Sequence, residues 1–586
     1  MLSRRTFIKV GGAYVALGGA LGETLAGPGA AALKMLAPGK PGGPAPDTGP
    51  LAPVTDDGDS EIIGGVPFAR RFTGDRFFDS LQHPAFPSLG EWIGYGNAPP
   101  SPAENADVVV IGAGLSGLAS AYLARAYNPV VLEHNSRSGG NSQGEMWRDI
   151  PYSLGGAYCI DGDGPIGALY EELGIREQIR KTSGPPNGDA VEYQGRLVPD
   201  FWFGAGSSQR SERAVYQAFY DLTLDIAKNM YPAIPLPSKN FEWILELDGV
   251  TFKDDIERRL GVPLPEGLVA AIQHYCFSSF NAGWDEISAA SGWNFLAAEI
   301  DPGEKVFPGG NTTIVGALWK RLASDLGPGF VRTKAVALDV RPYKGEGGGV
   351  LVTYGEDAPG RGPVRSIRAQ RVIVCVPKFV CRWIMPEYLR QDPARQNSMA
   401  LLDHRPYCVA NVLLNKGIPG DEYDLFLLRD GALPKNYGTE AWNAWHRPTD
   451  VVLSSFALMG TKDASVLTFY WPLPFTGGRT LLLLPGTLGQ LAERMRPTLE
   501  VTLGLLNMGL ADVQQVRFAR WGHALPVAAP GLIKNGHAQR IRAPIGDSVY
   551  FVQQDNWALP AVETCLQEAM EFVPLALAGL PSRGGR

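Results

Sequence analysis

The residues with the clearest chemical pattern in this chain are three glycines that follow an apolar run. Gly112, Gly114 and Gly117 come directly after Val108–Ile111 in the order Gly-x-Gly-x-x-Gly. In such a turn the first glycine allows a tight bend, the second lets a diphosphate approach the backbone, and the third lets helix and strand pack closely. The helix start then holds phosphates through its amides and its dipole. The pattern predicts a dinucleotide site, and an ordinary glycine turn is the alternative.

The flanking sequence supplies the other parts that such a site needs. Residues 118–126 have a helical pattern, and 130–133 are typical of the next strand, which ends on Glu133. Glu133 lies 21 residues after Gly112, where a carboxylate would bind a ribose hydroxyl. Two paired-glycine turns follow, at 139–140 and 155–156. They indicate backbone close to a large ligand, although hairpin turns use the same residues.

Side chains that could do chemistry on a bound substrate lie much later in the chain. His523 could orient a substrate or accept a proton, and a structural histidine bonded to the backbone is the alternative. Trp521 and Trp557 could stack on a ligand or simply pack. Tyr470 and Trp471 are neighbours on an expected strand, so only one of them can face a cavity.

Charged clusters give weaker indications. Glu299, Asp301 and Glu304 form an acidic cluster that could attract a cationic amine, and a solvated loop is the alternative. The tripeptide His-Arg-Pro occurs at His404 and again at His446, with no metal-ligand spacing around either. We therefore expect no metal site.

The composition limits the class of protein. A chain of 586 residues is too long for one simple core, so we expect two or more domains. The net charge of −7 carries no basic footprint, which excludes a typical nucleic-acid-binding protein. The six cysteines form no CxxC pair and lie in apolar settings, which indicates buried thiols. Their even number leaves disulfides open in an exported protein.

The N-terminus has the pattern of an export signal. Residues 3–9 read Ser-Arg-Arg-Thr-Phe-Ile-Lys, and a moderately apolar stretch follows from 10 to 26. Residues 30–32 offer a small-residue cleavage site. The pattern predicts that the twin-arginine translocase exports this protein, which would then be periplasmic or secreted. A basic N-terminus followed by a disordered tail is the alternative. The apolar stretch is too short and too weakly apolar to predict a membrane span.

Periodicity places further elements along the body. The block 211–296 is largely helical and is typical of the wall of a substrate cavity, with a scaffold that has no ligand role as the alternative. Strands are expected at 330–340, 349–354, 370–376, 408–414 and 465–471, and helices at 213–230, 266–277, 312–322 and 561–577. The stretch 548–555 reads as a strand that feeds the last helix.

In this order the motifs resemble the flavin amine oxidase superfamily over roughly 107–577. The resemblance rests on the glycine fingerprint, Glu133, the two glycine pairs, the Phe-Pro-Gly-Gly turn at 307–310, Val376-Pro377 and the closing strand and helix. The stretches Leu-Glu-His-Asn-Ser-Arg-Ser-Gly-Gly-Asn and Phe-Val-Gln-Gln-Asp are most similar to bacterial, twin-arginine-exported proteins related to spermidine dehydrogenase.

The resemblance implies an α/β fold, with a Rossmann-type FAD-binding domain and an α+β substrate domain of mixed sheet and helices. It implies FAD, held at the diphosphate, ribose, ribityl, adenine and isoalloxazine by Gly112, Gly114, Gly117, Glu133, Arg137, Gly140, Tyr158, Val336, Asp555 and Val562. The implied division is a signal at 1–32, a disordered linker at 33–60, an irregular extension at 61–102, FAD-binding parts at 103–200 and 301–385, a helical substrate region at 201–300, a substrate-domain sheet at 386–525 and a closing FAD-binding segment at 526–586.

The sequence departs from the family pattern around the flavin ring. Ala410 or Asn411 stands where many amine oxidases place a lysine that holds a water against flavin N5, and Lys416 is expected to be solvated. Ala561 stands where a tyrosine is usual, so the aromatic cage for amines is not visible.

The closing helix departs as well. Gln554-Asp555 replaces the usual Gly-Glu, and Thr564-Cys565 replaces Gly-Ala. These departures put an amine substrate and oxygen reactivity in doubt but leave flavin binding intact. No cysteine lies at the usual attachment point, so we expect FAD to be non-covalent.

The leading hypothesis is an exported FAD-dependent oxidoreductase that dehydrogenates a small organic substrate, with amines and polyamines as candidates, by hydride transfer to flavin N5. The electron acceptor stays open between oxygen, a quinone and a carrier protein, and so does the oligomeric state. One alternative is a desaturase or isomerase that acts on a C–C bond. Another is a flavin-bearing binding or assembly protein without turnover.

Overall fold

The valine-rich run before the three glycines forms the central strand of a parallel sheet. In the computed structural model, β5 (Glu104–Ile111) lies between β6 (Val130–Leu132) and β17 (Val364–Val374), and all three strands run parallel. β14 (Val331–Arg332) extends the sheet beyond β6, and β23 (Val549–Phe551) pairs with the carboxyl end of β17. The side chains of Val108, Val109 and Val110 are fully buried, as expected for a strand covered on both faces.

The structure describes the following residues: 47–54, 58–75, 98–160, 164–182, 190–356, 363–418, 423–429, 431, 433, 447–458 and 463–581. The predicted twin-arginine signal at 1–32 lies outside them. Within the described ranges, none of the helices combines the length and the apolar character needed to cross a bilayer. The predicted boundaries between the FAD-binding and substrate parts stay predictions.

One strand predicted from the sequence is in fact two. The stretch 330–340 divides at Lys334, whose backbone adopts a positive φ of 54°. β14 then lies at one edge of the sheet, while β15 (Ala335–Pro342) lies at the other edge and pairs with β16 (Val350–Glu356). An uninterrupted apolar pattern conceals such a break, because both halves are buried against the same sheet.

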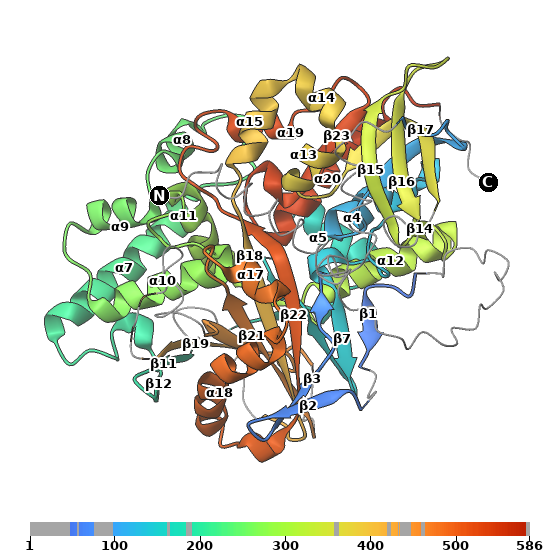
Figure 1. Ribbon diagram of the computed structural model, residues 1–586. Helices are drawn as coiled ribbons and strands as arrows, with labels where there is room; N and C mark the ends of the chain where they lie inside the picture. The colour runs from blue at the N-terminus through green and yellow to red at the C-terminus, as the bar shows by residue number, and fades with distance from the viewer. Residues whose placement is uncertain are drawn as a thin grey trace, which may run out of the picture. The chain divides into compact units, whose positions relative to one another are not determined.

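Helices cover the parallel sheet. α4 (Leu115–Leu123) starts within the glycine turn and packs against α12 (Thr312–Leu326) and α20 (Val562–Leu577) (Figure 1). Leu118, Ile314 and Leu566 are fully buried where these helices meet. α4 therefore begins three residues earlier than the helical pattern predicts, and it presents its first turn at the carboxyl ends of β5 and β6.

A second, larger sheet faces the first. Its order is β12-β11-β19-β20-β21-β18-β22-β3-β2, and β4 also pairs with β22. The bounds are β2 Ser60–Ile63, β3 Val66–Ala69, β4 Thr73–Gly74, β11 Ala190–Tyr193, β12 Arg196–Val198, β18 His404–Leu414, β19 Asp424–Arg429, β20 Asp450–Leu453, β21 Ser465–Pro472 and β22 Val513–Pro526.

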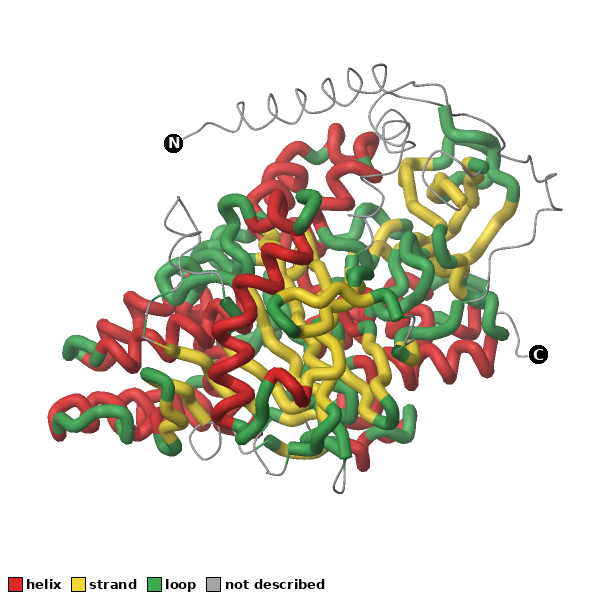
Figure 2. Tube along the Cα trace, turned by 60° about the horizontal axis from the view of Figure 1, so that its bottom comes forward, coloured by secondary structure: helices red, strands yellow, loops and turns green. Residues whose placement is uncertain are grey.

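Helices lie on both faces of this large sheet (Figure 2). Alternating residues of β19 join different cores. Phe426 and Leu428 pack with α10 (Glu266–Phe280), and Leu425 and Leu427 belong to the core that contains α18 (Thr487–Leu505). The helices of the two layers are α7 Arg210–Asn229, α8 Glu242–Asp248, α9 Phe252–Leu260, α10 Glu266–Phe280, α11 Ala289–Ala298, α17 Gly478–Leu483 and α18 Thr487–Leu505. The largely helical block predicted at 211–296 is confirmed.

Smaller elements join the two sheets. β1 (Leu51–Pro53), β7 (Gly144–Trp147) and β8 (Ile150–Ser153) form one three-stranded sheet, and β10 (Arg180–Lys181), β13 (Lys305–Val306) and β9 (Tyr158–Cys159) form another. The remaining helices are α5 Pro165–Glu172, α13 Lys378–Ile384, α14 Pro386–Gln391, α15 Pro393–Leu401 and α19 His537–Arg542.

The N-terminal part of the described chain differs from the prediction. A disordered linker at 33–60 and an irregular extension at 61–102 are wrong for 47–54 and 60–75, because β1 pairs with β7, and β2, β3 and β4 join the large sheet. Asp47 is buried, and its carboxylate accepts hydrogen bonds from Gly49 N and from Trp319 Nε1. The composition alone suggests disorder here. The segment is ordered by partners that lie far along the chain, and a local pattern cannot show them.

Candidate functional site

A large cavity opens where the carboxyl ends of the parallel strands face the large sheet. Its volume is about 1620 Å³. The wall includes Gly112 and Gly114 at one end and Glu299 and Tyr470 at the other. Pockets for drug-sized ligands span about 300–1,000 Å³. The cavity therefore has room for a dinucleotide together with a small substrate.

The glycine turn forms the phosphate end of this cavity. Gly112 has a φ of 97°, which favours glycine, and a Cβ on Gly140 would lie 3.0 Å from Gly114 Cα. Gly114 and Gly140 thus form a narrow backbone cradle in the wall. Gly117 lies outside the cavity: its Cβ would meet Gly112 O at 1.9 Å, so its role is the close packing of helix on strand.

Glu133 lies where the ribose of a dinucleotide is expected. Its buried carboxylate lines the cavity and accepts hydrogen bonds from Ala113 N at 2.7 Å and from Asn135 N at 2.8 Å. Although burial raises the pKa of Glu133, the charge of His134 and these hydrogen bonds bring it below its ordinary value. Glu133 is therefore an ionised acceptor held in a fixed orientation.

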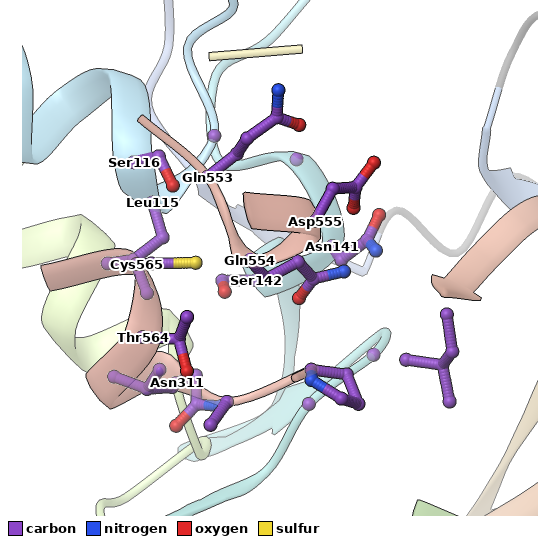
Figure 3. A pocket seen from close by; sticks show the side chains of 18 of the residues that line it. Leu115, Ser116, Asn141, Ser142, Asn311, Gln553, Gln554, Asp555, Thr564 and Cys565 are labelled. Atoms are coloured by element: carbon purple, nitrogen blue, oxygen red, sulfur yellow. The ribbon is translucent and has the colours of Figure 1, made fainter. Parts of the chain in front are cut away.

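Several buried polar atoms in the wall have no hydrogen-bond partner among the described residues. Asn311 Oδ1 and Thr564 Oγ1 are buried without a hydrogen bond, and both residues line the cavity beside Cys565 (Figure 3). Buried polar groups are normally paired, so these atoms indicate a polar ligand. The first turn of α20 also lines the wall, and its amides and dipole suit an anionic or carbonyl group there. The site therefore fits a dinucleotide such as FAD.

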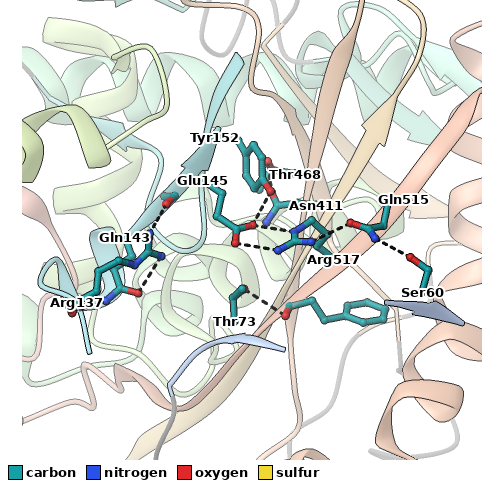
Figure 4. A network of polar contacts seen from close by, with 12 residues as sticks. Ser60, Thr73, Arg137, Gln143, Glu145, Tyr152, Asn411, Thr468, Gln515 and Arg517 are labelled. Atoms are coloured by element: carbon teal, nitrogen blue, oxygen red, sulfur yellow. Dashed lines mark hydrogen bonds and ion pairs between the residues drawn. The ribbon is translucent and has the colours of Figure 1, made fainter. Parts of the chain in front are cut away.

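Most of the cofactor residues predicted from the sequence come together in this wall. They are Gly112, Gly114, Glu133, Gly140, Tyr158, Val336, Asp555 and Val562. Arg137 differs: its guanidinium donates to Gly144 O at 3.1 Å and lies by Gln143, so it does not line the cavity (Figure 4). The loop after Glu133 turns Arg137 toward β7, which the spacing of the motif could not show.

The predicted catalytic residues divide between the cavity and the core. Trp521 and His523, both on β22, line the cavity. Trp521 Nε1 donates to Leu154 O at 2.7 Å, and the His523 ring stacks on Phe379 with 4.0 Å between ring centroids. Burial, together with the charges of Arg479 and His404, lowers the pKa of His523 to about 3. His523 is thus a neutral imidazole at neutral pH.

Trp557 lies away from the cavity, and the structure gives its predicted catalytic role no support. Its ring is buried, its Nε1 donates to Glu568 Oε1 at 2.8 Å, and the Arg542 guanidinium lies 4.9 Å from the ring centroid. It is a packing residue, because α20 brings Glu568 to its indole N–H.

The structure reveals aromatic and acidic residues at the substrate end that motif reasoning set aside. Tyr407 and Tyr470 both line the cavity and contact each other with 6.2 Å between ring centroids. The alternation predicted that only one of Tyr470 and Trp471 faces a cavity, and Tyr470 is that residue. Tyr158 lines the same end, so aromatic side chains reach the cavity from the large sheet and β9 rather than from α20.

Glu299 is the acidic residue of this end. It opens a π-helical turn, Glu299–Gly303, lines the cavity with 9% of its surface exposed, and accepts a hydrogen bond from Tyr275 Oη at 2.7 Å. Asp301 also lines the cavity but is exposed, while Glu304 is buried outside the wall. Of the predicted acidic cluster, for which a solvated loop was the alternative, Glu299 is thus a buried carboxylate beside a tyrosine.

The lysine that many amine oxidases place near the flavin ring has no counterpart on β18. Val409 lines the cavity, and Asn411 is buried with its Oδ1 bonded to Thr468 Oγ1 at 2.7 Å. Lys416 is exposed, as predicted. Among the residues that the structure describes, no group of three or more His, Cys, Asp or Glu side chains could hold a metal ion.

A buried hydrogen bond between His404 and Asp555 was not predicted. His404 Nε2 lies 2.7 Å from Asp555 Oδ2, which also accepts a hydrogen bond from Lys378 N at 2.7 Å. Asp555 lines the cavity, so these contacts fix an acceptor in its wall. A second pair, Arg517 with Glu145, ties the large sheet to β7 (Figure 4).

Comparisons with known proteins agree with this site. The model of the family "Flavin containing amine oxidoreductase" matches residues 115–464. Protoporphyrinogen oxidase 2 of Arabidopsis thaliana is 36% identical over 73 residues, which are 12% of this chain and 14% of that protein. A probable flavin-containing monoamine oxidase A of Dictyostelium discoideum is 32% identical over 97 residues, 16% of this chain and 21% of that protein. The matches thus span at most about a fifth of these curated relatives.

Solved structures share the fold over most of the chain. A double mutant of putrescine oxidase matches with a TM-score of 0.56 and 16% identity, covering 81% of this chain and 99% of that one. Cyclohexylamine oxidase from Brevibacterium oxydans matches with 0.57 and 17%, covering 80% and 99%. A fatty acid isomerase from P. acnes matches with 0.55 and 14%, covering 81% and 99%. The family model spans more than half of the chain, which shows that this chain belongs to the flavin-containing amine oxidoreductase family.

Proposed function

We propose that this chain is an exported enzyme that dehydrogenates a small amine at the carbon next to nitrogen. FAD, when bound, supplies the hydride acceptor at N5. The chain's own residues bind the amine, orient it and exclude water. A polyamine is the narrower candidate, as the resemblance to spermidine dehydrogenase suggests.

The observation that carries this proposal is the position of Glu299. Glu299 is nine-tenths buried and lines the cavity, and Tyr275 Oη orients its carboxylate by donating to Oε1. A buried carboxylate in a cavity wall favours a positive or hydrogen-bonding group inside that cavity. A substrate ammonium can supply both charge and hydrogen bonds. Glu299 is therefore suited to hold the ammonium group.

Aromatic side chains complete the recognition of a cation. Tyr158, Tyr407 and Tyr470 line the cavity, and their rings offer electron-rich faces to an ammonium ion. Burial raises the pKa of Tyr158 well above its ordinary value, and the charges of Glu299 and Glu304 raise it further, so its hydroxyl stays protonated. These residues also give the apolar shape that excludes water from the reacting carbon.

The export route and the electron acceptor belong to the same proposal. Twin-arginine systems carry folded proteins, so FAD would enter the cradle of Gly114 and Gly140 before translocation. The acceptor stays open between oxygen, a quinone and a carrier protein.

An anaerobic titration tests the proposed function. The purified holoenzyme is mixed without oxygen with cyclohexylamine, putrescine, spermidine, amino acids and polyunsaturated fatty acids, and the flavin absorbance is followed. We expect bleaching by an amine. Glu299→Gln should raise the amine concentration that gives half-maximal bleaching by about 30-fold or more, since a charged hydrogen bond contributes about 2 kcal/mol.

Glu304→Gln is the matched control, because it removes a buried charge in the same segment without touching the cavity. Glu304→Gln should raise the amine concentration that gives half-maximal bleaching much less than Glu299→Gln does. The assignment of Glu299 would be contradicted if the two variants had equal effects, or if neither changed the amine concentration needed for bleaching.

A second candidate function acts on a C–C bond. The cavity wall on β18 offers Val409 rather than a lysine, and the fold is shared with a fatty acid isomerase. A desaturase or isomerase would be supported by bleaching or double-bond migration with the unsaturated fatty acids alone. Flavin that keeps its colour with every compound would instead support a binding or assembly protein.

A further inference from the structure

Asp450 lies in line with the substrate cavity although it does not reach its surface. In the large sheet, Val409 of β18 pairs with Tyr470 of β21, and Tyr470 pairs with Asp450 of β20. Side chains of directly paired residues point to the same face of a sheet. Val409 and Tyr470 line the cavity. Asp450 is therefore on the cavity face, one strand beyond the wall.

Ser278 stands between Asp450 and the cavity. Asp450 is 2% exposed, and its carboxyl group hydrogen bonds to the side chains of Thr449 and Ser278. Ser278, on α10, lines the cavity, and its carbonyl accepts a hydrogen bond from Tyr407 Oη at 3.1 Å. Ser278 thus hydrogen bonds to the buried acid through its side chain and is itself part of the cavity wall.

Among the described residues, no positively charged side chain pairs with Asp450. Its neighbours across the strands are Tyr470 and Phe426, and the other titratable groups that respond to its charge are Tyr158 and Tyr407. Burial raises the pKa of Asp450 to about 7, against hydrogen bonds that lower it.

A buried carboxyl group without a counter-ion is neutral until a cation approaches it. On the basis of the proposed function, we propose that Asp450 is a positioning residue for cationic amines, which acts through Ser278 and loses its proton when the amine binds. The O–H bond of the carboxylic acid breaks and the proton leaves to solvent. No electrons move in this step. The carboxylate that remains accepts a hydrogen bond from the Ser278 hydroxyl, which leaves the Ser278 oxygen to accept one from the ammonium group.

The pH dependence of amine binding tests this inference. Anaerobic stopped-flow of the holoenzyme gives the Kd for cyclohexylamine and for putrescine from the rate of flavin bleaching at pH 5.5–8.5, where both amines stay charged. Wild-type affinity should rise up to about tenfold per pH unit below pH 7 and level off above it, because binding releases a proton from Asp450. Asp450→Asn should remove this rise, and Ser278→Ala should reduce it.

Asp339→Asn is the control, because Asp339 is a buried acid paired with Arg341 in the other sheet. It should keep the wild-type profile. A profile that levels off near pH 7 in Asp450→Asn would overturn the role of Asp450 while leaving the proposed function in place. Flavin that no amine bleaches contradicts the proposed function, and this inference with it.

Where Asp450→Asn loses flavin or stability, Ser278→Ala decides. A Ser278→Ala holoenzyme with the full wild-type pH profile would also overturn the inference.

Discussion

His404 from the large sheet holds Asp555 of the closing segment, with 2.7 Å between Nε2 and Oδ2. Both side chains are at most 3% exposed, and Asp555 lines the dinucleotide end of the cavity. Although burial raises the pKa of Asp555, the charge and hydrogen bond of His404 and the backbone N–H of Lys378 bring it below its ordinary value. The substrate sheet therefore fixes an acceptor of the cofactor site.

Replacing His404 should weaken FAD binding. His404→Ala removes a hydrogen bond to a charged group, which contributes about 2 kcal/mol, so the Kd for FAD should rise about 30-fold. His404→Gln, which can still donate to Asp555, should recover part of this loss. Recovery of flavin fluorescence on dilution measures both. Wild-type FAD affinity in His404→Ala would show that Asp555 needs no support.

Gly114 and Gly117 should respond differently to the same substitution. A Cβ on Gly114 lies 3.7 Å from the nearest protein atom, Gly140 Cα, so Gly114→Ala should fold. Its methyl group would occupy the cradle where the diphosphate approaches, and FAD should be lost. A Cβ on Gly117 meets Gly112 O at 1.9 Å, so Gly117→Ala should destabilise the fold by about 3 kcal/mol or more.

Thermal unfolding of the apoprotein separates the two effects. Gly114→Ala should keep the wild-type Tm within a few degrees, while Gly117→Ala should lower it clearly. Full FAD occupancy in Gly114→Ala would exclude this turn as the phosphate site.

His523 should contribute no titration to catalysis between pH 5 and 9, because its pKa lies near 3. His523→Gln should alter kcat/KM without moving the pH profile. The pKa of a histidine in the unfolded chain is about 6.5. The contribution of neutral His523 to the stability of the fold is therefore lost as the pH falls from about 6.5 toward 3. Between pH 8 and pH 5, the free energy of unfolding should therefore fall by about 1–2 kcal/mol less in His523→Gln than in wild type, as measured by urea unfolding.

The cysteines should be unreactive in the folded protein. All six are free in the structure, and burial raises the pKa of Cys375 to about 12 and that of Cys381 and Cys565 to about 11. Fewer than one thiol per folded chain should react quickly with a disulfide reagent at pH 8, since the thiolate is the nucleophile. Added reductant should leave the Tm unchanged. A Tm that falls with reductant would reveal a disulfide.

The dinucleotide half of the molecule was predictable because its signals are local. The strand, the three glycines, the helix and Glu133 depend on residues that follow one another, and φ angles, turns and hydrogen bonds at this range are set by neighbours. The family resemblance rests on the same local order. Lys334 marks the limit: one residue of positive φ sends the halves of an apolar run to opposite edges of the sheet.

The substrate end depended on contacts between distant parts of the chain. Trp557 and Tyr470 looked alike as aromatic candidates, yet Glu568 holds one in the core while the register of β21 turns the other into the cavity. Glu299 and Asp450 lie far apart in sequence, and only the packing of α10 on the large sheet brings both to one end. The sequence by itself determined the cofactor fold, because short-range geometry specifies it. Tertiary structure decided which side chains meet the substrate, because burial and charge there come from elements that the chain order separates.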